Sequence, residues 1–447
     1  MRHLYIVAII FLMASCNQDY GLEDYKIDQY KINSAVVDAI RASSPDGQLS
    51  YYQLPASDDY NRIPQDPNNR LTAQKIELGK LLFHETAFST DGNFPITGEE
   101  YSCASCHHAG AGFQAGVAQG LGEGGEGFGH MGEARIRNPL CAPELCDVQP
   151  IRSPTILNGA YQPVMLWNGQ FGATDVNVGT EDQWTEDTPK AINHLGFEGL
   201  ETQAIAGLKV HRIKYDAASV VEHGYKNMWD QVFADSPMED RYSLVNAGLA
   251  IAAYERTVLS NEAPFQKYLD GDYEALTTDE KIGAQIFFGK GQCSDCHTGP
   301  ALNKMEFHAL GLNEFNPSEV TFYNPEDPTR FGRFSFTKVE ADKFKFKTPQ
   351  LYNLRELEFL GHGASMNSVR EIIEYKNAGI AENPEVPLSQ LDLNPKGLTE
   401  TEITQLTLFV ENALHDGNLD RYVPSSLPSG NCFPNNDVIS KADLGCN

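Results

Sequence analysis

Two short motifs of cysteine and histidine carry the clearest chemistry in this sequence. Each reads Cys-x-x-Cys-His, and together they contribute Cys103, Cys106, His107, Cys293, Cys296 and His297. Two thiols at this spacing can add across the two vinyl groups of one haem, and the adjacent histidine then supplies a nitrogen to the iron. One such motif could be a redox dithiol or half of a zinc site, but two that both end in histidine favour haem. The sequence therefore predicts two covalently bound haem c groups, with His107 and His297 as iron ligands.

The chain has nine cysteines, and five of them lie outside these motifs. Cys16 follows an apolar N-terminal run. Cys141 lies close to Cys146, and Cys432 lies close to Cys446, so each pair could close a small loop in an oxidising compartment. Geometry decides whether two cysteines can be bridged, and the sequence leaves both pairs open.

The first sixteen residues, MRHLYIVAIIFLMASC, are typical of an export signal. A basic residue precedes an apolar run that is too short to span a membrane as a finished helix, and small residues lead directly into Cys16. This order resembles a bacterial lipobox, in which the cysteine is acylated; an ordinary secretory signal peptide is the alternative. We expect a protein of the periplasm or outer membrane, tethered to the membrane only by a lipid on Cys16.

Composition bounds the size and the partners of the protein. The chain has 447 residues, of which 41% are hydrophobic and 21% are charged, as expected for a globular protein of two or three domains. Its formal net charge of −27 disfavours nucleic acid and anionic lipid as partners. A basic partner protein fits this charge, and so does a solvated acidic surface with no partner.

Similar helices are predicted immediately before the two motifs. The segments 71–85 (LTAQKIELGKLLFHE) and 276–290 (LTTDEKIGAQIFFGK) both open with a threonine that can cap a helix, and both continue with apolar residues at helical spacing. Another helix is expected within 241–259, while the glycine-rich segment 109–133 and the segment 313–331 should be loops. The repeated arrangement predicts a mainly α fold with two tandem cytochrome c-like domains, each with one haem, and long loops.

Nine stretches, in one order, resemble the bacterial dihaem cytochrome c peroxidases and their relative, the methylamine-utilisation dihaem enzyme. The stretches are ELGKLLF, CASCH, RSPTILN, LWNGQ, LETQA, AAYERTV, FFGKGQCSDCH, FKTPQLYNL and GHGASMNSVREIIEYKNAG. Each stretch is weak alone, but their shared order over residues 70–420 is specific. The domains implied are a signal peptide (1–16), an N-terminal extension (17–69), a peroxidatic domain (70–260), an electron-transfer domain (261–420) and a C-terminal tail (421–447).

The resemblance implies a division of labour between the haems. The N-terminal haem would react with hydrogen peroxide and reduce it to water. The C-terminal haem would receive electrons from a small periplasmic cytochrome c or copper protein. The glutamate of the LETQA stretch, Glu201, would be the catalytic acid–base, since a carboxylate can move a proton between the two peroxide oxygens. A solvated charge at a helix start is the alternative for Glu201, and a homodimer is left open.

The remaining iron ligands stay open at this stage. His130 is the only histidine placed to resemble the resting-state ligand of the N-terminal haem, and a plain loop histidine is the alternative. For the C-terminal haem, Met366, Tyr375 and Lys376 are the candidates. Trp167 is a candidate electron relay between the haems, or else a packed core aromatic.

The resemblance also implies calcium between the domains, and two departures put that ion in doubt. Arg152 stands where the family has an asparagine, and Leu357-Glu358-Phe359 replace a Thr-x-Pro. Two other functions are compatible with the sequence. One is an oxidase or maturation enzyme that acts on a protein substrate, which a tyrosine ligand would favour. The other is a non-enzymatic electron carrier, which would need His130 or another strong ligand on the first iron.

Overall fold

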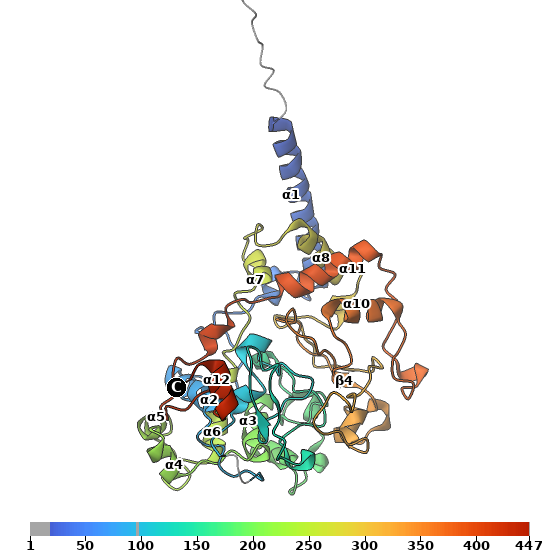
Figure 1. Cartoon of the computed structure of the whole chain (residues 1–447). Helices are drawn as coiled ribbons and strands as arrows, with labels where there is room; N and C mark the ends of the chain where they lie inside the picture. The colour runs from blue at the N-terminus through green and yellow to red at the C-terminus, as the bar shows by residue number, and fades with distance from the viewer. Residues whose placement is uncertain (1–17, 95–97, 447) are drawn as a thin grey trace, which may run out of the picture.

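The computed structural model describes residues 18–94 and 98–446, and the fold is mainly helical (Figure 1). The α-helices are α1 (Gln18–Ser43), α2 (Ala73–His84), α3 (Gly199–Val210), α4 (Ala217–Glu222), α5 (Lys226–Val232), α6 (Leu244–Glu255), α7 (Pro264–Leu269), α8 (Thr278–Phe288), α9 (Phe334–Thr337), α10 (Val369–Ala378), α11 (Glu400–Leu408) and α12 (Val438–Leu444). Two antiparallel pairs of short strands complete the set, namely β1 (Gly125–Glu126) with β2 (Ile136–Arg137), and β3 (Phe307–His308) with β4 (Phe346–Lys347). Long loops join these elements, and the predicted loops 109–133 and 313–331 contain no α-helix.

The two repeated helices form where the sequence predicts them. The Thr72 hydroxyl accepts a hydrogen bond from the Lys75 amide at the start of α2. At the start of α8 the Thr277 hydroxyl accepts a hydrogen bond from the Glu280 amide. The Glu280 carboxylate in turn accepts a hydrogen bond from the Thr277 amide. The predicted helix in 241–259 is confirmed as α6, which is capped by Ser243.

A glycine in each repeated helix lets a second helix approach its backbone. A Cβ atom on Gly79 of α2 would lie 1.8 Å from the Ala250 carbonyl oxygen of α6. A Cβ atom on Gly283 of α8 would lie 2.1 Å from the Gln405 carbonyl oxygen of α11. Each half of the chain therefore contains a helix that packs at a glycine against a later helix of the same half.

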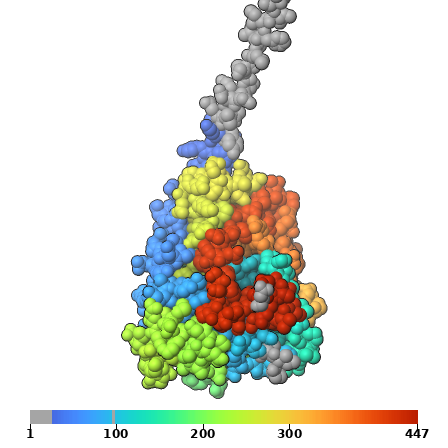
Figure 2. All heavy atoms as spheres, turned by 60° about the vertical axis from the view of Figure 1, so that its left-hand side comes forward, coloured from blue at the N-terminus to red at the C-terminus, as the bar shows by residue number. Residues whose placement is uncertain are grey.

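Both ends of the chain cross to the half that is remote in sequence. Helix α1 packs on α8 of the C-terminal half (Figure 1), whereas α12 contacts β1 in the N-terminal half. The C-terminal segment covers part of the N-terminal half on the surface (Figure 2). There the Ser102 hydroxyl donates to the Pro434 carbonyl (2.9 Å), and Arg135 pairs with Asp437 (3.4 Å). The segment 434–437 thus packs against residues on both sides of the first Cys-x-x-Cys-His motif.

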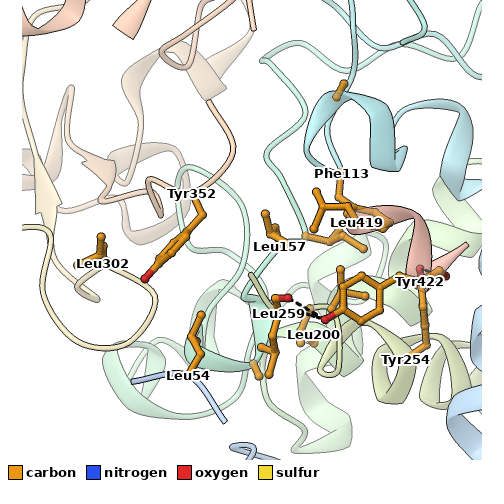
Figure 3. Close-up of a cluster of buried hydrophobic side chains, with 14 of the residues drawn as sticks. Leu54, Phe113, Leu157, Leu200, Tyr254, Leu259, Leu302, Tyr352, Leu419 and Tyr422 are labelled. Atoms are coloured by element: carbon orange, nitrogen blue, oxygen red, sulfur yellow. Dashed lines mark hydrogen bonds between the residues drawn. The ribbon is translucent and has the colours of Figure 1, made fainter. Parts of the chain in front are cut away.

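One continuous hydrophobic core joins the two halves. Figure 3 shows Tyr352 of the C-terminal half beside Leu157 of the N-terminal half, and Leu302 and Leu200 belong to the same buried cluster. The Tyr422 hydroxyl, from the C-terminal segment, donates to the Leu259 carbonyl at 2.7 Å within the same cluster. The core therefore fixes the relative position of the two motifs.

The cysteine pairs outside the motifs differ from each other. Cys432 and Cys446 form a disulfide, whereas Cys141 and Cys146 are buried free thiols whose sulfurs lie 2.6 Å apart. Cys16 and the predicted signal peptide lie outside the described residues. Within the described ranges, no helix is both long and apolar enough to span a membrane.

Candidate functional site

The two Cys-x-x-Cys-His motifs adopt the same local turn. The His107 amide donates to the Cys103 carbonyl (3.1 Å), and the His297 amide donates to the Cys293 carbonyl (2.9 Å). A short 3₁₀ turn spans Cys103–Ser105 in the first motif and Cys293–Asp295 in the second. The four motif cysteines are free thiols. Each motif therefore presents two thiols and one imidazole from a single turn of chain.

The imidazoles of His107 and His297 are oriented in the same way. Nδ1 of His107 lies 3.3 Å from the Phe113 carbonyl oxygen, and Nδ1 of His297 lies 3.1 Å from the carbonyl oxygens of both Leu302 and Pro349. An Nδ1–H that donates to a carbonyl fixes the tautomer and leaves Nε2 with its lone pair. Nε2 of neither ring has a hydrogen-bond partner among the residues that the structure describes. Burial lowers the pKa of both imidazoles to about 4, so both are neutral at pH 7, as iron ligation requires.

The second motif lines a cavity of about 450 Å³ that both halves of the chain enclose. This volume lies within the usual range of roughly 300–1,000 Å³ for cofactor sites. Its wall includes Cys293, Cys296 and His297. Helix α10 and strand β4 form other parts of the wall. The N-terminal half contributes six residues to the wall, which are Gln114, Arg152, Pro154, Thr155, Gln162 and Trp167.

Two buried cations in this wall have no carboxylate partner among the described residues. The Lys347 ammonium donates to the Gln162 side-chain oxygen at 2.6 Å, and burial lowers the pKa of Lys347 to about 8. Burial also lowers the pKa of Arg152 to about 9. Unpaired buried cations are costly unless an anion joins them. The two carboxylates of a haem would provide that anion, so the wall fits a haem held by the second motif.

Arg152 occupies a cage of oxygen acceptors. Its guanidinium donates to the carbonyls of Val117 (2.6 Å), Ala118 (3.1 Å) and Ala115 (2.9 Å) and to the Gln114 side chain (3.3 Å). Calcium needs six to eight oxygen ligands, and a guanidinium offers none. No cluster of three or more histidine, cysteine or acidic residues suited to a metal ion occurs in the described ranges. The residues at this position do not fit a calcium ion.

Trp167 lies where the two halves meet at the cavity. Its indole Nε1 donates to the Arg152 carbonyl (2.8 Å), and its carbonyl accepts from the Lys347 amide (2.7 Å). The indole packs edge-on against His362 at 6.3 Å between ring centres. Trp167 is therefore held by residues of both halves, with its ring in the wall of the cavity.

Glu201 lies in the first turn of α3 and is completely buried. Arg256, at the end of α6, donates to both of its oxygens, at 2.9 and 2.7 Å, and Asn69 donates to one of them at 3.1 Å. Glu201 is therefore not a solvated charge at a helix start, but one partner of a buried, bidentate ion pair with Arg256. The structure joins Glu201 to none of the motif residues by a hydrogen bond, so its proposed role depends on the resemblance and on its neighbours.

Glu255, next to Arg256, is a buried carboxylate that the sequence analysis did not single out. Its Oε2 has no hydrogen-bond partner, and it interacts electrostatically with Cys103 of the first motif. Burial, and then the charge of Glu201, raises the pKa of Glu255 to about 8. At pH 7 the environment therefore keeps Glu255 protonated, next in sequence to the guanidinium that pairs with Glu201. The sequence did offer one sign of this buried glutamate, because Glu255 directly follows the apolar run LAIAAY.

The other candidates fall into two groups. His130 is exposed in the glycine-rich loop, where its amide donates to Glu133, so it is placed as a loop residue. His108, which follows the first motif directly, is buried against Phe128. Of the three candidates on the C-terminal side, only Lys376 lines the cavity, whereas Met366 and Tyr375 do not.

Comparisons with known proteins agree with this arrangement. A family model described as di-haem cytochrome c peroxidase matches residues 73–274. Cytochrome-c peroxidase IdrP1 of Denitromonas iodatirespirans is 30% identical over 375 residues, which cover 78% of this chain and 84% of that protein. The methylamine utilization protein MauG of Methylorubrum extorquens is 27% identical over 350 residues, which cover 78% and 80%.

Solved structures share the fold. A MauG-like protein associated with microbial copper homeostasis superposes with a TM-score of 0.53 at 22% identity, covering 82% of this chain and 96% of that one. The diheme peroxidase BthA of Burkholderia thailandensis superposes with a TM-score of 0.51 at 17% identity, covering 81% and 90%. On the strength of the 30% identical relative, the chain belongs to the di-haem cytochrome c peroxidase family and is an enzyme of that family.

Proposed function

We propose that this enzyme reduces hydrogen peroxide to water with electrons from a small cytochrome c or copper protein. One observation supports this most strongly: two Cys-x-x-Cys-His turns with matching imidazole orientation are joined by one core in a family of di-haem peroxidases. In this proposal Cys103, Cys106 and His107 hold the peroxidatic haem. Cys293, Cys296 and His297 hold the haem that receives electrons. The haems supply the redox chemistry, and the protein supplies their positions, ligands and protons.

In this proposal Glu201 and Glu255 carry out the proton transfers that peroxide reduction requires. Arg256 donates to both oxygens of Glu201, while burial raises the pKa of Glu255 to about 8 and so holds a proton on it. A carboxyl group paired with a guanidinium and a nearby protonated carboxyl group can serve as base and acid in the same site. We assign Glu201 as the group that takes a proton from peroxide and Glu255 as a proton store beside it, since reduction of peroxide to water consumes protons.

The electron path in the proposal runs from the C-terminal cavity towards the first motif through Trp167. The indole lies in the cavity wall and is hydrogen-bonded to Arg152 of the N-terminal half. This position suits an electron relay, and it also suits a side chain that only joins the two halves of the chain.

The proposed setting is the periplasmic side of a membrane, with a lipid on Cys16 as the only anchor. The basis is the lipobox-like order of the first sixteen residues. A donor with a basic face would suit the net charge of −27.

Peroxide turnover by haem-loaded protein tests the function. With a reduced cytochrome c as donor, wild type should consume peroxide, and Glu201→Gln should lose about 10²-fold or more of that rate. Glu198→Gln is the matched control, because Glu198 also pairs with Arg256 (2.9 Å) but is partly exposed. We expect it to retain activity. No turnover in wild type, even after prior reduction of the C-terminal haem, would refute the peroxidase.

A second candidate function, oxidation of a protein substrate, follows from the similarity to MauG. The tyrosine ligand that would favour it is not supported, because the Tyr375 hydroxyl donates to the Leu310 carbonyl at 2.6 Å. A carrier role would need a strong ligand such as His130 on the first iron, and His130 is exposed in its loop. The peroxidase therefore remains the function that we propose.

A further inference from the structure

One face of helix α10 (Val369–Ala378) forms a wall of the C-terminal cavity. Val369, Ile372, Ile373 and Lys376 recur at three- and four-residue spacing, so they share one face of the helix. All four line the cavity, and Tyr375 does not. The cavity wall thus consists here of three apolar side chains and one primary amine.

Lys376 has no hydrogen-bond or ion-pair partner in the part of the chain that the structure describes. Protein surrounds its side chain on nearly every side, yet the residue keeps some accessible surface, as expected for a group that faces an internal space. Cys293, Cys296 and His297 line the same cavity, and the Lys376 ammonium interacts electrostatically with all three. An unpaired amine therefore shares a cavity with the second motif.

The other histidine and lysine side chains of the cavity wall, apart from His297, have partners. His308 lies 3.1 Å from Asp392 through Nδ1 and 3.6 Å from the Cys296 sulfur through Nε2. His362 faces Glu314 (3.3 Å) and stacks on Phe346. The Lys347 and Lys396 ammoniums donate to side-chain oxygens at 2.6 and 3.1 Å.

The two alternatives suggested by the sequence are also engaged elsewhere. The Met366 side chain is buried in the core, and its main chain pairs with Leu360 on both sides. The Tyr375 hydroxyl donates to the Leu310 carbonyl and accepts from the Glu382 amide. Neither residue belongs to the cavity wall.

We propose that Lys376 is the second protein ligand of the C-terminal haem iron, together with His297. The inference rests on the proposed function, because it requires a haem on Cys293 and Cys296. The amine binds through its lone pair and must release a proton first, so ligation takes up a neutral lysine. An amine lacks the thioether sulfur that raises the potential of haem iron, so the C-terminal haem should be harder to reduce than a methionine-ligated one.

Spectroscopy of the full haem-loaded chain tests this proposal. A pyridine haemochrome assay first counts covalent haems, and two per chain are expected in wild type and every variant. Ferric wild type should show a low-spin C-terminal haem without the red absorption band of a thioether–iron bond. Lys376→Met should gain that band and a higher reduction potential, and Lys376→Ala should convert this haem to high spin.

Tyr375→Phe is the matched control, one residue away on the same helix, and its spectrum should equal that of wild type. Pulsed electron paramagnetic resonance of protein labelled with ¹⁵Nζ-lysine needs no variant, and it should detect a lysine nitrogen bound to iron. Fewer than two haems per chain would overturn the proposed function and this inference together. Two haems with no lysine nitrogen signal, or with a Lys376→Met spectrum identical to wild type, would overturn the lysine ligand alone.

Discussion

At the scale of single residues, neighbouring side chains of the same type differ because their environments differ. Glu201 and Glu255 are both buried, but only Glu201 faces a guanidinium with both oxygens. The sequence predicted Glu201 through the LETQA stretch. It could not predict that Glu255 stays protonated, because that depends on which side chains of α3 and α6 meet in the folded chain.

Glu255 gives the protein a pH-dependent stability with a defined sign. Its pKa rises from 4.5 in the unfolded chain to about 8 in the folded protein, so between these values the folded state binds more protons. The free energy of unfolding should therefore fall as pH rises from about 5 to about 8. Urea midpoints measured across this range should decline in wild type and decline less in Glu255→Gln. Equal slopes in both proteins would contradict the assignment.

The position of Arg152 leads us to predict that the activity and stability of the protein do not depend on calcium. Its guanidinium already satisfies three carbonyls and the Gln114 side chain. Treatment with EGTA should leave peroxide turnover and the melting temperature unchanged, and metal analysis should find no stoichiometric calcium. Arg152→Met should lower stability by roughly 3 kcal/mol or more, because several buried acceptors lose their donor. Loss of activity in EGTA that calcium restores would refute this view.

At the scale of elements, local sequence signals were sufficient for the helices before each motif. Threonine caps and apolar spacing predicted α2 and α8, and both form at the expected residues. The contacts between elements were not predictable in the same way. The packing of α1 on α8 and of α12 on β1 joins segments hundreds of residues apart, and no local pattern encodes such a contact.

Gly79 tests the close packing of α2 on α6. Alanine in place of Gly79 would bring Cβ to 1.8 Å from the Ala250 carbonyl oxygen, and backbone atoms cannot move away without strain. Gly79→Ala should destabilise the protein by about 1–3 kcal/mol or more. Gly207→Ala in α3 is the control, because its nearest neighbour is a flexible side chain at 3.4 Å, and alanine favours the helix. Thermal unfolding of both variants is the measurement, and equal melting temperatures would argue against the close contact.

At the scale of the whole molecule, one core and two crossing chain ends hold the motifs in a fixed relation. The proposed boundaries at residues 70, 260 and 420 describe the sequence repeat. In the folded chain, side chains of both halves form the wall of the cavity. This arrangement suits a molecule in which electrons pass from one half to the other. Trp167 is the residue at which that passage can be tested.

The central claim is that electrons stored in the C-terminal half reduce peroxide at the N-terminal half. Its most direct test is stopped-flow spectroscopy of reduced, haem-loaded protein mixed with hydrogen peroxide, with Trp167→Phe as the variant. Trp184→Phe is the control, because Trp184 is also buried and donates to the Thr180 hydroxyl, but it does not line the cavity. We predict that the C-terminal haem is oxidised as peroxide disappears, with slower oxidation in Trp167→Phe and wild-type rates in Trp184→Phe. A C-terminal haem that stays reduced while peroxide persists would contradict the account.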